Sequence, residues 1–360
     1  MAQKKKRTIR VGLVGYGQHG KWSVAPALRA AKHVQLKAVT DLSAANLVLL
    51  PDPRVSTYTD FRRMLRQEEL DAVYVATRVE SHAEIVLAAL RAGLHVIVEK
   101  PMATSVQECR RMVAAAKKAD RLLAVDFESR YIPGFRQIRD WIAAGRLGKI
   151  GAIHMDHFWD GHKVTGPLAE RRRLFCESSG CLDCGIHKLD LARYFNGGGR
   201  WRDIRATGAW FGEKVRYAPH IAIQARLDTG VLVTVNTSFA FTAYIPQRLP
   251  SANYYTLAIL GEKGVVVLHQ APDGASHVQI VSETLNEVVP FIPHGHTSVI
   301  VSVLNDFAAA VLTGRPLPPE IATGEDGLMA QVIVDEANRQ AVEAGDSCQL
   351  KPSRGRSAKA

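Results

Sequence analysis

Short hydrophobic runs alternate with amphipathic stretches over the first third of the chain. The runs are rich in Val, Ile, Leu and Ala and end at polar or turn-forming residues, which is typical of strands buried on both faces. They predict strands at residues 8–14, 34–40, 70–76, 94–98 and 122–127. The stretches between them predict helices that end at Ala31, Ala92 and Ala119. Strands and helices that alternate through short loops predict a parallel sheet with right-handed crossovers.

The pattern changes after residue 130. A helix through Trp141 and a strand at 150–159 precede short alternating segments separated by turn signals, which are typical of an antiparallel sheet. These strands are predicted at residues 206–210, 221–226, 231–238, 255–260 and 264–269, with helices at 296–313 and 325–344. We therefore predict an α/β domain at 8–130, an α+β domain at 131–350, and tails at 1–7 and 351–360.

The composition is that of an ordinary globular protein, with 47% hydrophobic and 22% charged residues among 360. This length suits two domains. We find no run of 18 apolar residues and no apolar segment behind the charged N-terminus, so we expect neither a membrane span nor a secretion signal. Five cysteines, an odd number, favour a reducing compartment, and we predict a cytoplasmic protein.

The formal net charge of +11 raises the question of a nucleic-acid partner. Nine of the eleven excess positive charges lie in residues 1–10 and 351–360, so the body of the chain is nearly neutral. Charged tails of this kind are usually solvated and bind polyanions weakly, without sequence preference. We expect no specific nucleic-acid partner.

The first predicted strand runs into a G-x-G-x-x-G turn, and a helix follows. Between strand and helix this spacing is typical of a dinucleotide site. The first glycine permits the tight turn, the second lets the backbone approach a pyrophosphate, and the third lets helix and strand pack closely. The helix N-terminus adds free N–H groups and a partial positive charge. The predicted cofactor-binding residues here are Gly15, Gly17, Gln18, His19 and Gly20.

Asp41 ends the second predicted strand, 21 residues after Gly20. An acid at this spacing binds the ribose hydroxyls in dinucleotide folds and repels a 2′-phosphate. We predict NAD(H) as the cofactor, with NADP(H) as the alternative. An ordinary aspartate capping a turn would look the same in sequence.

Glu99, Lys100 and Pro101 directly follow the strand at 94–98. Pro101 prevents the strand from continuing, so Lys100 is delivered to the carboxyl end of the sheet, where ligands bind in open α/β folds. A strand-end lysine that reaches for water is the simpler alternative.

A second candidate segment reads Asp183-x-Gly185-x-His187-x-x-Asp190. On a helix, Asp183 and His187 lie one turn apart on one face, and Asp190 continues that stripe. A carboxylate there can orient an imidazole that acts as a general base. A solvated Asp–His pair is the alternative.

A metal site competes for the same histidine. Cys176, Cys181, Cys184 and His187 have a spacing that could bind zinc. That site would use His187 as a metal ligand and would leave Asp183 without a role, so we predict no metal.

Taken together, these motifs resemble the Gfo/Idh/MocA family, the relatives of glucose–fructose oxidoreductase and inositol dehydrogenase. The matching positions are the glycine turn, Asp41, Thr77 with His82, Glu99-Lys100-Pro101 and the Asp183-to-Asp190 segment. Two segments depart from the pattern: Arg78 follows Thr77 where relatives commonly carry proline, and Ser178-Ser179 stands in a run usually written with glycines. The effect of Arg78 on the pocket stays open.

The resemblance implies a Rossmann domain with a doubly wound parallel sheet, then a domain with a large, mostly antiparallel open sheet that commonly builds homodimers or homotetramers. It implies Lys100, Asp183 and His187 as catalytic residues. It places Thr77, His82, Glu99 and Lys100 beside the cofactor. Candidates for contact with substrate are Arg130, His157 and Trp159, and Asp156 and Asp160 offer further polar groups.

The expected activity is hydride transfer between nicotinamide and a secondary alcohol or ketone of a sugar, sugar derivative or cyclitol. His187 would take and return the hydroxyl proton, Lys100 would stabilise the alkoxide, and Asp183 would orient His187. Two alternatives remain within the resemblance. One is a redox-assisted glycoside hydrolase or lyase that keeps its NAD tightly bound, and the other is a ligand sensor without activity.

Overall fold

The computed structural model describes residues 8–159, 185–210, 216–238, 253–270, 276–292 and 295–348. The described elements are β1 (Ile9–Val14), the π-helical turn η1 (Gly20–Val24), α1 (Ala25–Ala30), β2 (Val34–Thr40), α2 (Ala44–Val48), β3 (Ser56–Tyr58), α3 (Phe61–Gln67), β4 (Ala72–Val75), η2 (Val79–Ser81), α4 (His82–Arg91), β5 (His95–Glu99), α5 (Val106–Ala119), β6 (Leu123–Asp126), η3 (Glu128–Tyr131), α6 (Pro133–Ala143), β7 (Ile150–Trp159), α8 (Ile186–Asn196), β8 (Trp201–Ala209), β9 (His220–Leu227), β10 (Leu232–Ser238), β11 (Asn253–Gly261), β12 (Gly264–Gln270), β13 (Ser276–Ser282), β14 (Asn286–Pro290), α9 (His296–Thr313), β15 (Ala322–Thr323) and α10 (Gly324–Cys348).

The chain forms two compact units whose segments interleave. The first unit comprises Met1–Arg146, Asp190–Gly198 and Val289–Val332. The second unit comprises Leu147–Leu189, Gly199–Val288 and Ile333–Ala360. The predicted contiguous domains, 8–130 and 131–350, stay a proposal drawn from the sequence alone. The compact units differ from them because later segments return to the first unit.

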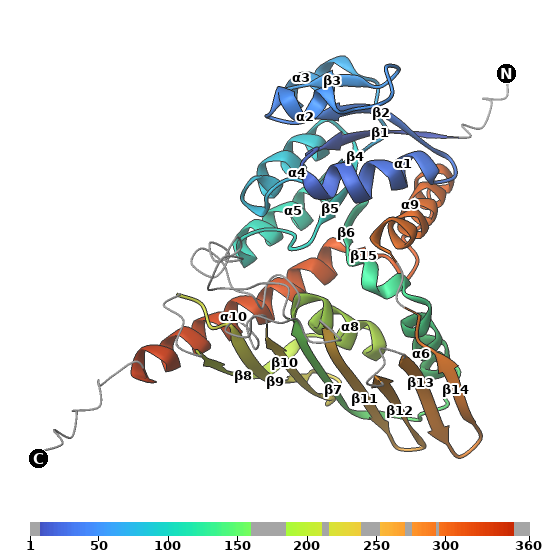
Figure 1. Ribbon diagram of the computed structural model, residues 1–360, viewed down its shortest axis with the longest axis vertical. Helices are drawn as coiled ribbons and strands as arrows, with labels where there is room; N and C mark the ends of the chain where they lie inside the picture. Colours follow the sequence, from blue (N-terminus) through green and yellow to red (C-terminus); the bar gives the residue numbers. More distant parts are fainter. Residues whose placement is uncertain are drawn as a thin grey trace, which may run out of the picture. The chain divides into compact units, whose positions relative to one another are not determined.

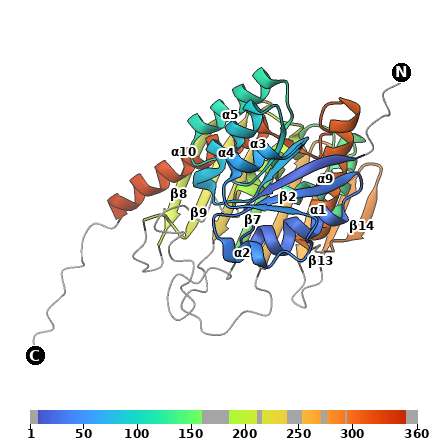
Figure 2. The ribbon, with the colours of Figure 1, turned by 90° about the horizontal axis from the view of Figure 1, so that it is seen from above.

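The first unit has the predicted Rossmann architecture. In the described part, its sheet has the strand order β15-β6-β5-β4-β1-β2-β3, and its pairings are parallel except for β15 with β6. Helices α4 and α5 pack together on one face, and α1 and α9 pack together on the other (Figures 1 and 2). Strands β2 and β3 follow β1 toward one edge of the sheet, whereas β5 and β6 follow β4 toward the other edge, so the strand order reverses between β1 and β4. Ligands bind at such a reversal, at the carboxyl ends of the strands.

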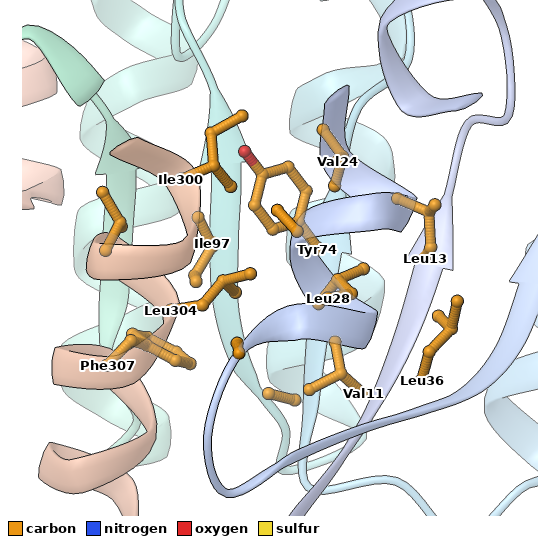
Figure 3. Packing of buried hydrophobic residues seen from close by; sticks show 14 of the residues in the cluster. Val11, Leu13, Val24, Leu28, Leu36, Tyr74, Ile97, Ile300, Leu304 and Phe307 are labelled. Carbon is orange, nitrogen blue, oxygen red and sulfur yellow. The ribbon is translucent and has the colours of Figure 1, made fainter. Parts of the chain in front are cut away.

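The core of the first unit joins the sheet to α1 and α9. Tyr74 and Ile97 of the sheet belong to one buried cluster with Leu28 of α1 and with Ile300 and Leu304 of α9 (Figure 3). By length and composition alone, α9 could cross a membrane, which is weak evidence. Because Ile300 and Leu304 are buried in this cluster, α9 packs as a core helix of the first unit.

The second unit contains the predicted open sheet. Its order in the described residues is β14-β13-β12-β11-β7-β10-β9-β8, and most neighbours are antiparallel. The exception is β10, which pairs with β7 in parallel. Strands β13 and β14 were not predicted from the sequence. They extend the sheet at one edge, and β14 is largely exposed, so its hydrophobic pattern is weak.

Candidate active site

The glycine turn has the packing that a dinucleotide site requires. Gly15 has a φ of 102°, and a Cβ there would fall 2.4 Å from the carbonyl oxygen of Ala76. A Cβ on Gly20 would fall 2.1 Å from the carbonyl oxygen of Gly15, so helix and strand are in close contact. An added Cβ on Gly17 would meet no heavy atom of the described chain within 4 Å. The backbone at Gly17 is therefore open to a pyrophosphate, and the loop fits a dinucleotide.

Asp41 lies beside this turn. Its Oδ2 accepts a hydrogen bond from the N–H of Tyr16 at 2.7 Å. Its Oδ1 accepts from the N–H of Ser43 at 2.8 Å and from Nδ2 of Asn46 at 3.0 Å. Carboxylate oxygens have about four acceptor sites between them. The carboxylate is thus fixed by the chain and still has capacity for a ribose hydroxyl.

His82 is buried and joins two turns at the carboxyl end of the sheet. Its Nδ1 lies 3.0 Å from the carbonyl oxygen of Pro101, and its Nε2 lies 3.1 Å from that of Thr77. Burial lowers the pKa of His82, whereas the contacts with the two carbonyl oxygens act in the opposite direction. These two contacts link the Pro101 turn to the end of β4, and the contact of His82 with the cofactor stays a prediction. Thr77 itself is partly exposed there, and its Oγ1 accepts from Ser81 Oγ at 2.8 Å.

Glu99, the last residue of β5, joins the strand end to the glycine turn. Its Oε1 lies 2.9 Å from Nε2 of His19 and accepts from the hydroxyl of Tyr74 at 2.8 Å. The bond to Glu99 raises the pKa of His19. Lys100 follows directly and is partly buried, and its peptide bond to Pro101 is cis. The structure thus brings together His19, Glu99 and Lys100, which the sequence analysis placed in two separate motifs.

Two further residues lie at this edge, Tyr74 and Asp126, and neither belongs to a motif predicted from the sequence. Asp126 ends β6 and lies opposite Glu99 in the strand register. The hydroxyl of Tyr74 contacts both carboxyl groups. Burial raises the pKa of Tyr74 and of Asp126 well above their usual ranges. Asp126 was detectable, since it is the second-to-last residue of the predicted strand at 122–127, at the same edge of the sheet as Glu99.

A second imidazole–carboxylate pair lies next to His19. Nδ1 of His296, the first residue of α9, is 3.3 Å from Oε1 of Glu128. The rings of His19 and His296 meet edge to face, with centroids 6.1 Å apart. Glu128 raises the pKa of His296. The carboxyl edge of the sheet therefore carries a dense group of titratable side chains.

Arg130 occupies a structural position. Its guanidinium donates to both carboxylate oxygens of Asp190 and to the carbonyl oxygen of Pro319, and it lies 3.5 Å from Asp326. The side chain is 3% exposed. The predicted substrate contact is not supported by this arrangement, because the donors of Arg130 are engaged within the first unit. Asp190, expected to extend the His187 stripe, is instead the anion of this pair.

In the second unit, His187 lies at the start of α8 and is buried. The next residue, Lys188, is also buried, and its Nζ lies 4.1 Å from the ring centroid of Tyr255. The ring of His157, a predicted substrate candidate, lies 5.6 Å from the same ring. Lys188 and Tyr255 were not predicted. The carboxylate of Asp156, on the same strand as His157, accepts hydrogen bonds from the side chains of Asn236 and Thr256 on the neighbouring strands.

Several predicted residues cannot be placed. Asp183, Asp160 and the three cysteines of the zinc alternative lie outside the described residues, as does the side chain of Trp159. The helix expected to carry Asp183 and His187 is described from Ile186 onward. The pairing of Asp183 with His187, and the expectation that the cysteines bind no metal, therefore stay predictions.

Comparison with known proteins identifies the family. The sequence profile described as "Oxidoreductase family, NAD-binding Rossmann fold" matches residues 9–127, and that described as "GFO/IDH/MocA C-terminal domain" matches residues 135–267. The uncharacterized oxidoreductase YrbE of Bacillus subtilis is 26% identical over 344 residues, which are 92% of this chain and 94% of YrbE. The myo-inositol 2-dehydrogenase of Thermotoga maritima is 25% identical over 352 residues, which are 95% and 99% of the two chains.

Solved structures agree on the fold. A levoglucosan dehydrogenase in complex with NADH and levoglucosan superposes with a TM-score of 0.77 at 22% identity, covering 93% of this chain and 98% of the other. An oxidoreductase from Agrobacterium radiobacter, in complex with NAD⁺, L-tartaric acid and magnesium, has a TM-score of 0.79 at 19% identity and covers 93% and 97%. With profiles matching both the Rossmann region and the region that follows it, the chain belongs to the Gfo/Idh/MocA family of NAD-binding oxidoreductases, which act on CH–OH groups.

Proposed function

We propose that the protein is an NAD-dependent dehydrogenase or reductase that interconverts a secondary alcohol and a ketone on a sugar, sugar derivative or cyclitol. The observation that carries the proposal is the 2.9 Å contact between His19 Nε2 and Glu99 Oε1. This contact joins the dinucleotide turn to the strand end that presents Lys100. A positively charged donor beside a dinucleotide turn suits alcohol oxidation, because negative charge develops on the reacting oxygen. Relatives named for myo-inositol and levoglucosan support a polyhydroxylated substrate.

We propose NAD(H) rather than NADP(H) as the cofactor. Gly17 leaves room for the pyrophosphate, and Asp41 is fixed where a ribose hydroxyl can be bound. A carboxylate there disfavours a 2′-phosphate, and no arginine follows directly in Asp41-Leu42-Ser43. When bound, the nicotinamide supplies hydride exchange with the substrate carbon. Gln18, His19 and Thr77 stay candidates for further contacts with the cofactor.

The chemistry assigned to the chain is proton transfer and charge stabilisation. The imidazole of His187 takes the hydroxyl proton during oxidation and returns it during reduction. The ammonium of Lys100 donates a hydrogen bond to the reacting oxygen, and Asp183 orients His187. Groups in such roles each contribute about 10²–10⁴ in rate.

Absorbance of NADH across a panel of sugars, cyclitols and their keto forms tests the activity. Lys100→Met and His187→Ala should each reduce turnover by about 10²-fold or more, and His187→Ala should retain NAD binding. Lys118→Met and His269→Ala, which change exposed residues of α5 and β12, are the matched controls. Turnover near the wild-type value in both active-site variants would contradict the assignment.

The same assay separates this proposal from the alternatives. A dehydrogenase accumulates NADH, a redox-assisted hydrolase or lyase returns the hydride within each turnover, and a sensor binds its ligand without turnover. No observation favours the two alternatives. We further propose that the protein is cytoplasmic and that it forms a homodimer or homotetramer. Light scattering of the purified protein would test the oligomeric state.

A further inference from the structure

The hydroxyl of Tyr74 lies between two buried carboxyl groups. It is 2.8 Å from Oε1 of Glu99 and is also hydrogen-bonded to Oδ2 of Asp126. These groups come from three adjacent strands, β4, β5 and β6, at their carboxyl ends. The ring of Tyr74 packs in the core among residues of α1 and α9 (Figure 3). Packing therefore fixes the hydroxyl between its two partners.

Counting protons favours an arrangement in which one of the two carboxyl groups is protonated. A phenol has one proton and donates it to one acceptor. If Glu99 and Asp126 were both ionised, one of them would face a lone pair of the Tyr74 oxygen at hydrogen-bonding distance. A protonated carboxyl removes this conflict, because it donates to the phenol oxygen while the phenol donates to the other carboxylate.

The surroundings assign that proton to Asp126. Glu99 has a second hydrogen-bonding partner in Nε2 of His19, so its carboxyl group is contacted from two sides. Oδ1 of Asp126 is buried and has no hydrogen-bond partner among the described residues, a position that is costly for an ionised oxygen. Burial, then the charges of Glu99 and Glu128, raise the pKa of Asp126, whereas Tyr74 and Lys100 act in the opposite direction.

We propose that Tyr74 and protonated Asp126 are positioning residues that hold Glu99 as an anion, and that Glu99 in turn holds His19 as a cation in the glycine turn. The donors then run from Asp126 to Tyr74 to Glu99, with His19 donating to Glu99 from the other side. A cationic His19 in the turn attracts the pyrophosphate of the cofactor. The inference rests on the proposed NAD site and is independent of the substrate.

Other charged groups face the same cluster and set its pH dependence. Glu128 adds to the effect of Glu99 in raising the pKa of His19, and Lys100 lowers it. His296 lies beside His19 and is paired with Glu128. Because His19 loses its charge at high pH, NAD affinity should fall as the pH rises through the raised pKa of His19.

The test compares two substitutions of an acid by its amide. Asp126→Asn keeps a donor toward Tyr74, so it should rescue the NAD affinity that Asp126→Ala loses. Glu99→Gln removes the charge that holds His19, so it should weaken NAD binding by about tenfold or more and move the high-pH loss of affinity to lower pH. If Asp126→Asn weakens binding as much as Glu99→Gln does, the assignment of the proton is wrong.

A second measurement needs neither activity nor cofactor. Above the pKa of an unfolded aspartate, about 4, the folded protein retains a proton that the unfolded chain releases. Stability should therefore fall with rising pH, with about a tenfold change in the unfolding constant per pH unit from this group. Asp126→Asn should remove that contribution.

The control for this slope is Tyr131→Phe. It removes a Tyr–Asp bond, from the Tyr131 hydroxyl to Asp306 at 2.8 Å, and should lower stability without changing the slope. Carboxyl ¹³C titration of the wild-type protein covers the case in which the variants do not fold. It should show an aspartate that stays protonated at pH 7. A fully ionised aspartate population, or an unchanged slope in Asp126→Asn, would overturn the proposal.

Discussion

Arg130 and Asp190 form a buried ion pair that is held at two points. Nε of Arg130 donates to Oδ2 of Asp190 at 2.7 Å, and Nη2 donates to Oδ1 at 2.6 Å. The two side chains are 3% and 1% exposed. Nη1 donates to the carbonyl oxygen of Pro319 at 3.1 Å. The pair therefore ties together three parts of the first unit, which are η3, the part of α8 from Asp190 onward and the segment before β15.

Removing one partner of this pair should destabilise the first unit severely. Arg130→Met leaves the carboxylate of Asp190 buried without its counterion, and such losses cost about 3–5 kcal/mol. Urea unfolding followed by circular dichroism measures the effect. The control is Arg62→Ala, which breaks the exposed pair with Glu84 and should cost at most about 1 kcal/mol. Equal losses in the two variants would show that Arg130 has no structural role.

The case of Arg130 shows what the sequence can and cannot predict. The Rossmann strands were predicted closely because a buried parallel strand is a continuous apolar run, as in Leu123–Asp126. The partner of Arg130 is 60 residues away, and no local pattern links the two positions. Tyr74 was missed for a related reason, since its run predicts a buried strand whether or not the hydroxyl meets two carboxyl groups.

Substitutions at two glycines of the turn should affect stability and cofactor binding separately. A Cβ on Gly20 would overlap the carbonyl oxygen of Gly15, so Gly20→Ala should lower stability by about 1–3 kcal/mol or more. A Cβ on Gly17 would meet no heavy atom of the described residues within 4 Å, so Gly17→Ala should leave the melting temperature close to wild type. The same Cβ would occupy the space proposed for the pyrophosphate, and we expect about a tenfold loss of NAD affinity, or about 1.4 kcal/mol.

Thermal unfolding and isothermal titration calorimetry on both variants check this pair of expectations. The interpretation fails if Gly17→Ala binds NAD as tightly as the wild type. It also fails if Gly20→Ala melts at the wild-type temperature.

Acid should destabilise the protein through His82. Burial lowers the pKa of His82 in the folded state, so below about pH 6.5 the unfolded chain binds a proton that the folded protein does not. Stability therefore falls as the pH drops through this range, by up to about 1.4 kcal/mol per pH unit. The sign is opposite to that expected for Asp126.

Replacing the imidazole of His82 should reduce the loss of stability at acid pH. His82→Gln cannot take up a proton, so its unfolding free energy should change less than that of the wild type between about pH 6.5 and pH 5. Unfolding in urea at several pH values provides the measurement. The exposed His269, changed to Gln, serves as the control and should retain the wild-type slope. Identical slopes for His82→Gln and the wild type would contradict the assignment.

Asp41 should determine the choice between NAD and NADP. Its carboxylate is fixed by Tyr16, Ser43 and Asn46, so its negative charge is held beside the glycine turn. Asp41→Asn removes the charge that opposes a 2′-phosphate and weakens the acceptor for the ribose hydroxyls. The ratio of NAD to NADP affinity should fall by at least about tenfold, as measured by titration calorimetry with each dinucleotide. Asp52→Asn, which changes another aspartate of the same unit paired with Arg54, should leave the ratio unchanged. If Asp41→Asn and Asp52→Asn give the same ratio, the carboxylate of Asp41 does not contact the ribose, and cofactor choice must depend on other residues around the glycine turn.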